Sequence, residues 1–337
     1  MKRLSLIATF CTWMLTATIA LATPASLFVA TPFARATVGA AINTSQMAGN
    51  QSVIQQLILA PGGYSGWHTH RGGAVIFVQA GTLSLYDDSC AKTVTAENRG
   101  AVERAGNVHL ARNETSGLLI LTVVFFDVPV GAAVRSDAAT PACAVGADAN
   151  DLPETSTPSG TSFKVPGGIV QRATFAAPFT ITTAAERDVL AQRVTIAPGG
   201  DSGWHGHPGM VLVYVESGTL TFYDQNCAKQ SYTAGQGAIE GANERSLARN
   251  DGTSPVVTRA VLFNIPVAGS ARIDGAAPAN CPVVAGAVAA PQALPNTSVD
   301  PGVSTGLDPA IVAILVALAS VIALAAIQRS RARSRLG

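Results

Sequence analysis

An internal repeat constrains the fold of this chain more than any other feature of its sequence. Residues 61–70 (PGGYSGWHTH) recur as residues 198–207 (PGGDSGWHGH), an offset of 137 residues. The same offset relates many other positions without a gap, and register kept over such a distance indicates a duplicated domain. We therefore expect two copies of one fold, at 37–146 and 166–284, joined by a flexible linker at 147–165.

Within each copy, short apolar runs alternate with turn residues. In the first copy these runs lie at 53–59, 74–78, 82–86 and 118–128. Runs that are rich in β-branched residues and bounded by glycine, proline or aspartate are typical of the strands of a sandwich or barrel. The fold class is therefore predicted to be all-β, and only residues 183–189 show a weak helical period.

All five histidines of the chain belong to the repeated pattern. They are His68, His70 and His109 in the first copy, and His205 and His207 in the second. Residues i and i+2 of a strand face the same side, so each His-x-His pair presents both imidazoles to one space. Neutral imidazole is the commonest metal ligand, and we therefore expect a metal site at the three histidines of the first copy.

The metal expected at this site is a divalent transition ion. Ligand type alone does not choose among iron, zinc, manganese, nickel and copper. In the second copy, Ser246 stands where the third histidine would be. Two histidines make a poor mononuclear site, since catalytic zinc normally keeps three protein ligands. We therefore interpret His205 and His207 as a weak or vestigial second site.

These motifs resemble those of the cupin family, which read G-x5-H-x-H-x3–4-E-x6-G and P-x-G-x2-H-x3-N. The first copy matches them at Gly62, His68, His70, Gly81, Gly106, His109 and Asn113. The resemblance implies two tandem double-stranded β-helix (jelly-roll) barrels, a bicupin. It also implies that the family's three histidine ligands correspond to the three histidines of the first copy.

The chain departs from the family pattern at the carboxylate ligand. The family's glutamate falls at Ala74 in the first copy and at Val211 in the second, and neither side chain binds metal. Glu103 and Glu240 lie near the second motif, and we interpret them as solvated turn residues. Manganese bicupins that degrade oxalate need the missing glutamate, which argues against oxalate chemistry. The remaining three-histidine face resembles that of the cupin thiol and diketone dioxygenases.

Two classes of function follow from this site. The first is an extracytoplasmic surface protein that binds a metal or a small ligand through the first copy. The second is a metal-dependent oxygenase of the dioxygenase-like cupin type, although the sequence marks no clear catalytic acid or base. Nucleic acid is not expected as a partner, because the formal net charge is only +1.

Both ends of the chain carry the features of targeting and anchoring segments. Residues 1–22 have the basic start, apolar stretch and small-residue end of a secretory signal, with cleavage as late as residue 36 as the alternative. Residues 309–327 are uncharged and just long enough to cross a hydrocarbon core of about 30 Å. The arginine-rich tail at 328–337 then predicts a single-pass protein of the cell membrane with its body outside.

A stalk at 285–308 would link the body to this membrane segment. Within it, residues 294–298 (LPNTS) resemble the cell-wall sorting signal that bacterial sortases cut. The signal of that family ends in glycine, whereas Ser298 stands here. An uncut stalk that is rich in proline, threonine and serine is therefore the other interpretation.

Four cysteines lie outside the predicted signal segment, at matching places in the two copies. An even number at repeated spacing in an exported protein predicts disulfides. We expect the pairs Cys90–Cys143 and Cys227–Cys281, one within each domain. Each would stabilise the fold by roughly 4 kcal/mol through loop closure. We also expect the two barrels to pair within one chain, with pairing across a homo-oligomer as the alternative.

Overall fold

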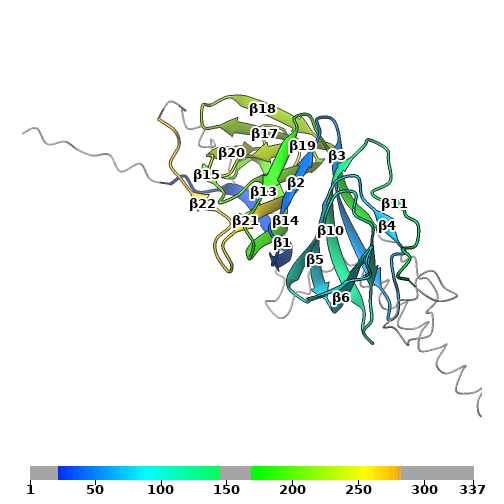
Figure 1. Ribbon diagram of the computed structural model, residues 1–337. Coiled ribbons are helices and arrows are strands. Elements are labelled where there is room, and N and C mark those ends of the chain that lie inside the picture. The colour runs from blue at the N-terminus through cyan, green and yellow to red at the C-terminus, as the bar shows by residue number, and fades with distance from the viewer. Residues whose placement is uncertain (1–21, 145–167, 280, 282–337) are drawn as a thin grey trace, which may run out of the picture.

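The structure is a computed structural model that describes residues 22–144, 168–279 and 281 (Figure 1). Over these residues it consists of strands, turns and bends, which confirms the all-β prediction. Residues 183–189 form a bend that leads into a strand, so the weak helical period there was misleading. Within the described residues we find no helix that could cross a membrane. The predicted span at 309–327 lies outside them, as does the stalk.

The two copies have the same sequence of strands. The first copy contains β1 (Ser26–Val38), β2 (Asn43–Gln46), β3 (Gln51–Leu59), β4 (His68–Thr69), β5 (Ala74–Ala80), β6 (Thr82–Asp87), β7 (Lys92–Ala96), β8 (Arg99–Glu103), β9 (His109–Arg112), β10 (Leu119–Val128) and β11 (Ser136–Asp137). The second contains β12 (Ile169–Phe175), β13 (Phe179–Thr182), β14 (Arg187–Asp201), β15 (His205–Gly206), β16 (Val211–Ser217), β17 (Thr219–Asp224), β18 (Lys229–Thr233), β19 (Gln236–Glu240), β20 (Ser246–Arg249), β21 (Val256–Ile265) and β22 (Ile273–Asp274).

Each copy forms a barrel from two layers of strands. In barrel 1 the layers have the strand orders β8-β5-β10-β3 and β11-β4-β9-β6-β7, and in barrel 2 they are β19-β16-β21-β14 and β22-β15-β20-β17-β18. A separate apolar core fills each barrel, with Val123 and Leu83 in the first and Ala260 and Leu220 in the second. Because side chains alternate along each strand, one face of a layer contributes to this interior and the other faces outward.

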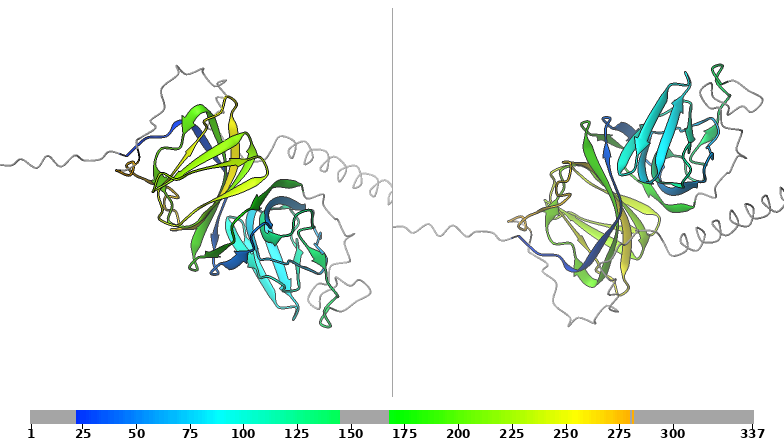
Figure 2. Two further views of the ribbon diagram at one scale, coloured as in Figure 1. Left: turned by 90° about the horizontal axis from the view of Figure 1, so that it is seen from above. Right: turned by 90° about the horizontal axis from the view of Figure 1, so that it is seen from below.

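The barrels exchange their first strands. Strand β1 of the first copy pairs along its length with β14 of the second, and β12 of the second copy pairs with β3 of the first. Figure 2 shows β1 crossing to the strands of the second copy. The short strands β2 and β13 pair with each other, with Thr44 opposite its own repeat equivalent, Ile181. The two copies are thus related by a pseudo-two-fold axis that passes between these residues.

A third apolar core lies between the barrels. It combines residues from both copies, including Ile54, Phe126, Phe175 and Phe263. Tyr214 is fully buried there, and its hydroxyl lies 2.7 Å from the hydroxyl of Ser52 in the other copy. A shared core of this kind, together with the exchanged strands, makes the two copies one folding unit.

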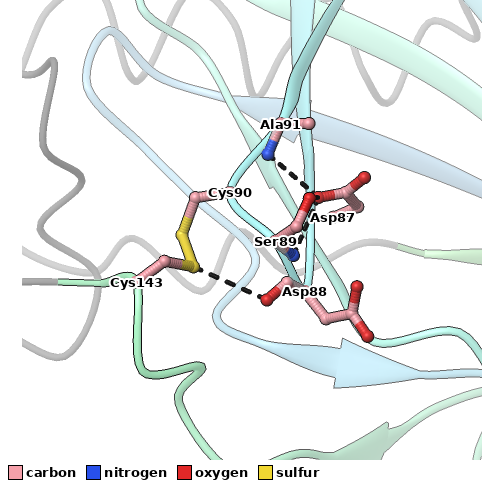
Figure 3. The surroundings of a disulfide bond; sticks show 6 residues. All are labelled: Asp87, Asp88, Ser89, Cys90, Ala91 and Cys143. Carbon is pink, nitrogen blue, oxygen red and sulfur yellow. Dashed lines mark hydrogen bonds between the residues drawn. A yellow bond between two sulfur atoms is a disulfide. The ribbon is translucent and has the colours of Figure 1, made fainter.

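Both predicted disulfides are present. The Cα atoms of Cys90 and Cys143 are 6.0 Å apart, and those of Cys227 and Cys281 are 5.5 Å apart. Figure 3 shows the first bridge at the turn between β6 and β7, where the carboxylate of Asp87 accepts hydrogen bonds from the amides of Ser89 and Ala91.

Each bridge lies beside a buried tryptophan that precedes the His-x-His pair. Trp67 packs with Tyr64, Tyr86 and Leu110. Trp204 packs with Leu247 and the second bridge. The bridge and the aromatic cluster together fix the start of each histidine strand.

Candidate metal centre

The structure brings the three histidines of the first copy together inside barrel 1. His68 lies on β4, His70 follows that strand directly, and His109 begins β9, opposite His68 in the antiparallel pair. Their ring centroids are 4.3 to 5.1 Å apart, and all three side chains are buried. The alternation along β4 therefore places both imidazoles of the pair in the interior, as the sequence predicts.

A carboxylate completes this group, and our interpretation of Glu103 as a solvated turn residue was wrong. Glu103 is only 6% exposed, and its two carboxylate oxygens lie 3.1 Å from Nε2 of His70 and 3.1 Å from Nε2 of His109. It ends β8, where it is the antiparallel partner of Ala74 on β5. The family pattern places a carboxylate at position 74. Here Glu103, the partner of Ala74 on the neighbouring strand, supplies it instead.

The proton positions on the three imidazoles follow from their Nδ1 partners. Nδ1 of His68 lies 2.8 Å from the carbonyl oxygen of Gly66, and Nδ1 of His70 lies 2.8 Å from that of Val134. Nδ1 of His109 lies 3.0 Å from that of Asn107. A carbonyl oxygen only accepts hydrogen bonds, so each Nδ1 carries a proton. In the neutral tautomer, the lone pair of each ring is therefore on Nε2.

Nε2 lone pairs that face a carboxylate require a cation between them. Nε2 of His70 and of His109 are buried and have no hydrogen-bond partner in the structure, although each lies 3.1 Å from a carboxylate oxygen of Glu103. Two electron pairs at this distance repel each other unless a proton or a metal ion lies between them. The geometry of barrel 1 is therefore that of a cation site.

The ionisation of the group is consistent with this conclusion. Burial, together with the neighbouring His109 ring, lowers the pKa of His68 to about 3. Burial alone would raise the pKa of Glu103, but His109 and His70 outweigh it and hold this pKa well below its usual range. Burial likewise opposes the charged form of His109, but Glu103 raises its pKa above the ordinary value. Glu103 and His109 therefore each stabilise the charged form of the other.

Ser65 ties the two histidine strands of barrel 1 together. Its hydroxyl accepts a hydrogen bond from the amide of Ala111 on β9, at 2.9 Å, and lies 3.3 Å from Nδ1 of His68. Ser202 makes the equivalent contacts with Ala248 and His205 in barrel 2. Hydrogen-bonding partners of this kind hold the ligand rings in one orientation, and their loss lowers the affinity for the metal.

Barrel 2 contains a smaller group of the same kind. His205, His207 and Glu240 are buried together, with the carboxylate of Glu240 3.8 Å and 3.6 Å from the two Nε2 atoms. Glu240, which we also took for a turn residue, is only 8% exposed. Ser246, at the place of the third histidine, donates a hydrogen bond to Glu240. The second group therefore has three ligand residues, one more than the sequence predicted.

The donor sets fit a divalent transition metal. Three imidazoles and a carboxylate form a mixed nitrogen and oxygen set, whereas magnesium and calcium prefer oxygen alone. The four ligand residues of barrel 1 can each direct one atom to a common point, because these atoms all lie within 4.8 Å of one another. Iron, zinc, manganese, nickel and copper all remain compatible with this set.

A cavity leads to the group in barrel 1. Its volume is about 460 Å³, and it is lined by His68, His70 and Glu103 together with apolar side chains such as Leu121 and Phe125. The corresponding cavity of barrel 2 has a volume of only about 120 Å³. Ligand cavities typically measure about 300–1,000 Å³, so barrel 1 has room for a small molecule beside its metal group.

Comparison with known proteins identifies the domain type. A model of the cupin domain matches residues 56–125 and 192–262, once in each barrel. None of the curated proteins matches the chain. Similar solved structures include oxalate decarboxylase from Bacillus subtilis at pH 4.6, which is 13% identical over 77% of this chain and 80% of that chain, with a TM-score of 0.33.

A study of the Mn(II) centres of the same enzyme gave another similar structure. It is also 13% identical, over 75% of this chain and 80% of that chain, with a TM-score of 0.32.

Proposed function

Because the chain belongs to the cupin family and carries its domain twice, we propose that barrel 1 holds a divalent transition metal and uses it to bind a small molecule. The ligands are His68, His70, Glu103 and His109. This replaces the three-histidine site that the sequence predicted. Barrel 2 serves mainly as a structural partner with a weaker site at His205, His207 and Glu240.

One observation carries the proposal. The buried Nε2 atoms of His70 and His109 each lie 3.1 Å from a carboxylate oxygen of Glu103, a geometry that requires a cation between nitrogen and oxygen. Leaving buried polar atoms unsatisfied costs roughly 1–3 kcal/mol each, and more for charged groups. A divalent ion satisfies all of them at once, which a single proton does not.

The chain's own residues prepare this site in three ways. The backbone carbonyls on Nδ1 fix each imidazole in the tautomer that binds metal through Nε2. The ligand side chains are buried among the apolar walls of barrel 1. The cavity brings a small molecule to the face of the group that the protein does not cover. A bound divalent ion would act as a Lewis acid towards an oxygen atom of that molecule.

The proposed location is the outer face of a cell membrane. Residues 309–327 would span this membrane, and the basic tail at 328–337 would lie in the cytoplasm. Disulfides such as the two observed here are typical of exported proteins. Signal cleavage after Ala22 would leave Thr23, whose hydroxyl accepts a hydrogen bond from the amide of Trp204 at 2.7 Å. Cleavage after residue 36 would remove most of β1, and the fold therefore favours the earlier site.

A metal-dependent oxygenase is the second candidate. The cavity beside the ligands favours it, because such an enzyme must admit an organic substrate to the metal. The sequence argument against oxalate chemistry no longer holds, since it depended on a missing glutamate that Glu103 supplies. The mostly apolar cavity walls nevertheless fit a larger and less polar molecule than oxalate.

Elemental analysis tests the proposal. The chain from Thr23 to its C-terminus, purified in mild detergent, is expected to contain about one transition-metal ion firmly bound to barrel 1. His68→Ala should lose this metal, whereas the matched change in barrel 2, His205→Ala, should retain it. Equal metal content in both variants, or a metal-free wild-type chain that has been exposed to these ions, would rule out barrel 1 as the principal site.

A further inference from the structure

The cavity of barrel 1 has a polar floor and apolar walls. His68, His70 and Glu103 form the floor, and the walls include Leu57, Ile76, Leu121, Val123 and Phe125. Such an arrangement suits a molecule with one polar end and an apolar body, because burial of apolar surface against the walls is favourable. A ligand that is polar throughout would leave these walls without an apolar partner.

The charge of the floor specifies the polar end of the ligand. Three neutral imidazoles contribute no charge, Glu103 contributes one negative charge, and a divalent ion contributes two positive charges. The net charge is therefore +1, which a monoanionic oxygen donor neutralises. Arg135 at the rim does not change this balance, because its guanidinium donates a hydrogen bond to Asp137 at 2.6 Å and forms an ion pair with it.

The chain's own N-terminal strand narrows the apolar cavity of barrel 2, whereas a second cavity of about 450 Å³ reaches Glu240 and Ser246 between more polar walls. Phe28 and Ala30 of β1 line the apolar cavity, together with His205, His207 and Glu240. Ser26 secures the same strand by a hydrogen bond to Asp201 at 3.1 Å. At the repeat offset the equivalent of Phe28 is Val165, a smaller residue that lies outside the described part of the chain.

We propose that the protein binds a small organic monoanion with an apolar body in barrel 1, because the corresponding apolar cavity of barrel 2 is narrowed by Phe28. The anionic oxygens lie at the metal group, and the apolar body lies against Leu121, Val123 and Phe125. This inference rests on the proposed function, since it requires the metal of barrel 1.

Two hydroxamates test the inference by calorimetry on the zinc-loaded chain from Thr23 to its C-terminus. Benzohydroxamate and acetohydroxamate present the same monoanionic oxygen donor, but only the first has an apolar ring. We expect one benzohydroxamate per chain, bound at least about tenfold more tightly than acetohydroxamate because the ring is buried against the walls. Metal content is measured before and after each titration.

A matched pair of variants locates the site. Ala133 is exposed and lines the mouth of the barrel 1 cavity, and Ser270 is its exposed repeat equivalent in barrel 2. Ala133→Trp should weaken benzohydroxamate binding at least about tenfold with the zinc retained, and Ser270→Trp should leave it unchanged.

The outcomes separate the two proposals. A chain that retains neither zinc nor any other divalent transition metal refutes the proposed function. A zinc-loaded chain that binds both hydroxamates equally, or that loses binding equally in the two variants, refutes this inference while the metal site stands.

Discussion

At the scale of single residues, the site depends on a carboxylate that the sequence does not place. The three histidines could be predicted, since two share one strand face and the third belongs to a recognisable motif. Glu103 could not, because its role depends on the register between β5 and β8, which sets it opposite Ala74. One signal was available, namely that Glu103 and Glu240 occupy the same place in both copies.

Replacing this carboxylate tests its role as a ligand. Glu103→Gln keeps the shape of the side chain but removes the charge, so the affinity of barrel 1 for a divalent metal should fall. Loss of an outer partner of a ligand typically costs about 10–100-fold, and loss of the ligand itself should cost at least as much. Competition with a chelator measures the change. The matched variant Glu240→Gln should leave the affinity of barrel 1 unaltered, and an equal loss in both variants would contradict the assignment.

At the scale of secondary structure, exchange of β1 between the copies was beyond the reach of sequence analysis. The strands and their turns are local features, and alternation and turn residues predicted them. The partner of a strand is not local, because its apolar pattern fits either barrel equally well. In the structure, Arg35 and Thr37 on β1 both donate hydrogen bonds to Asp188 on β14, at 2.9 and 2.6 Å, and these contacts fix the exchanged strand.

Asp188 should give the exchanged strand a pH-dependent stability. Burial opposes its ionisation, but the hydrogen bonds from Thr37 and Arg35 outweigh it and lower the pKa of Asp188 below the ordinary value. A lowered folded-state pKa gives stability that is complete above the unfolded pKa of about 3.9 and is lost as the pH falls through the folded value. Asp188→Asn should therefore cost about 1–2 kcal/mol of unfolding free energy at pH 7.

Urea titrations of wild type and variant at pH 7 and near pH 3 measure this difference, which should shrink at the lower pH. Glu186 provides the control, because its ion pair with Arg99 is largely exposed. Glu186→Gln should change the stability by less than about 0.5 kcal/mol. A stability difference for Asp188→Asn that is the same at both pH values would show that its charge does not hold the strand.

At the scale of the whole molecule, two copies of one domain have taken different roles within one folding unit. The repeat offset predicted the duplication, and the cysteine spacing predicted both bridges. The difference in cavity volume was not predictable, because it arises where β1 of one copy enters the barrel of the other. Barrel 1 retains four ligand residues beside a roomy apolar cavity, and barrel 2 retains three beside an apolar cavity that Phe28 narrows.

Anomalous X-ray diffraction from crystals of the chain that starts at Thr23 tests the central claim most directly. Data collected on both sides of the absorption edge of the metal found by elemental analysis should show a strong peak inside barrel 1. The peak should lie about 2.0–2.2 Å from Nε2 of His68, His70 and His109 and from an oxygen of Glu103. The result that would contradict a metal site in barrel 1 is the absence of such a peak. Glu103 would then still lie about 3 Å from the two imidazoles, with a proton shared between them.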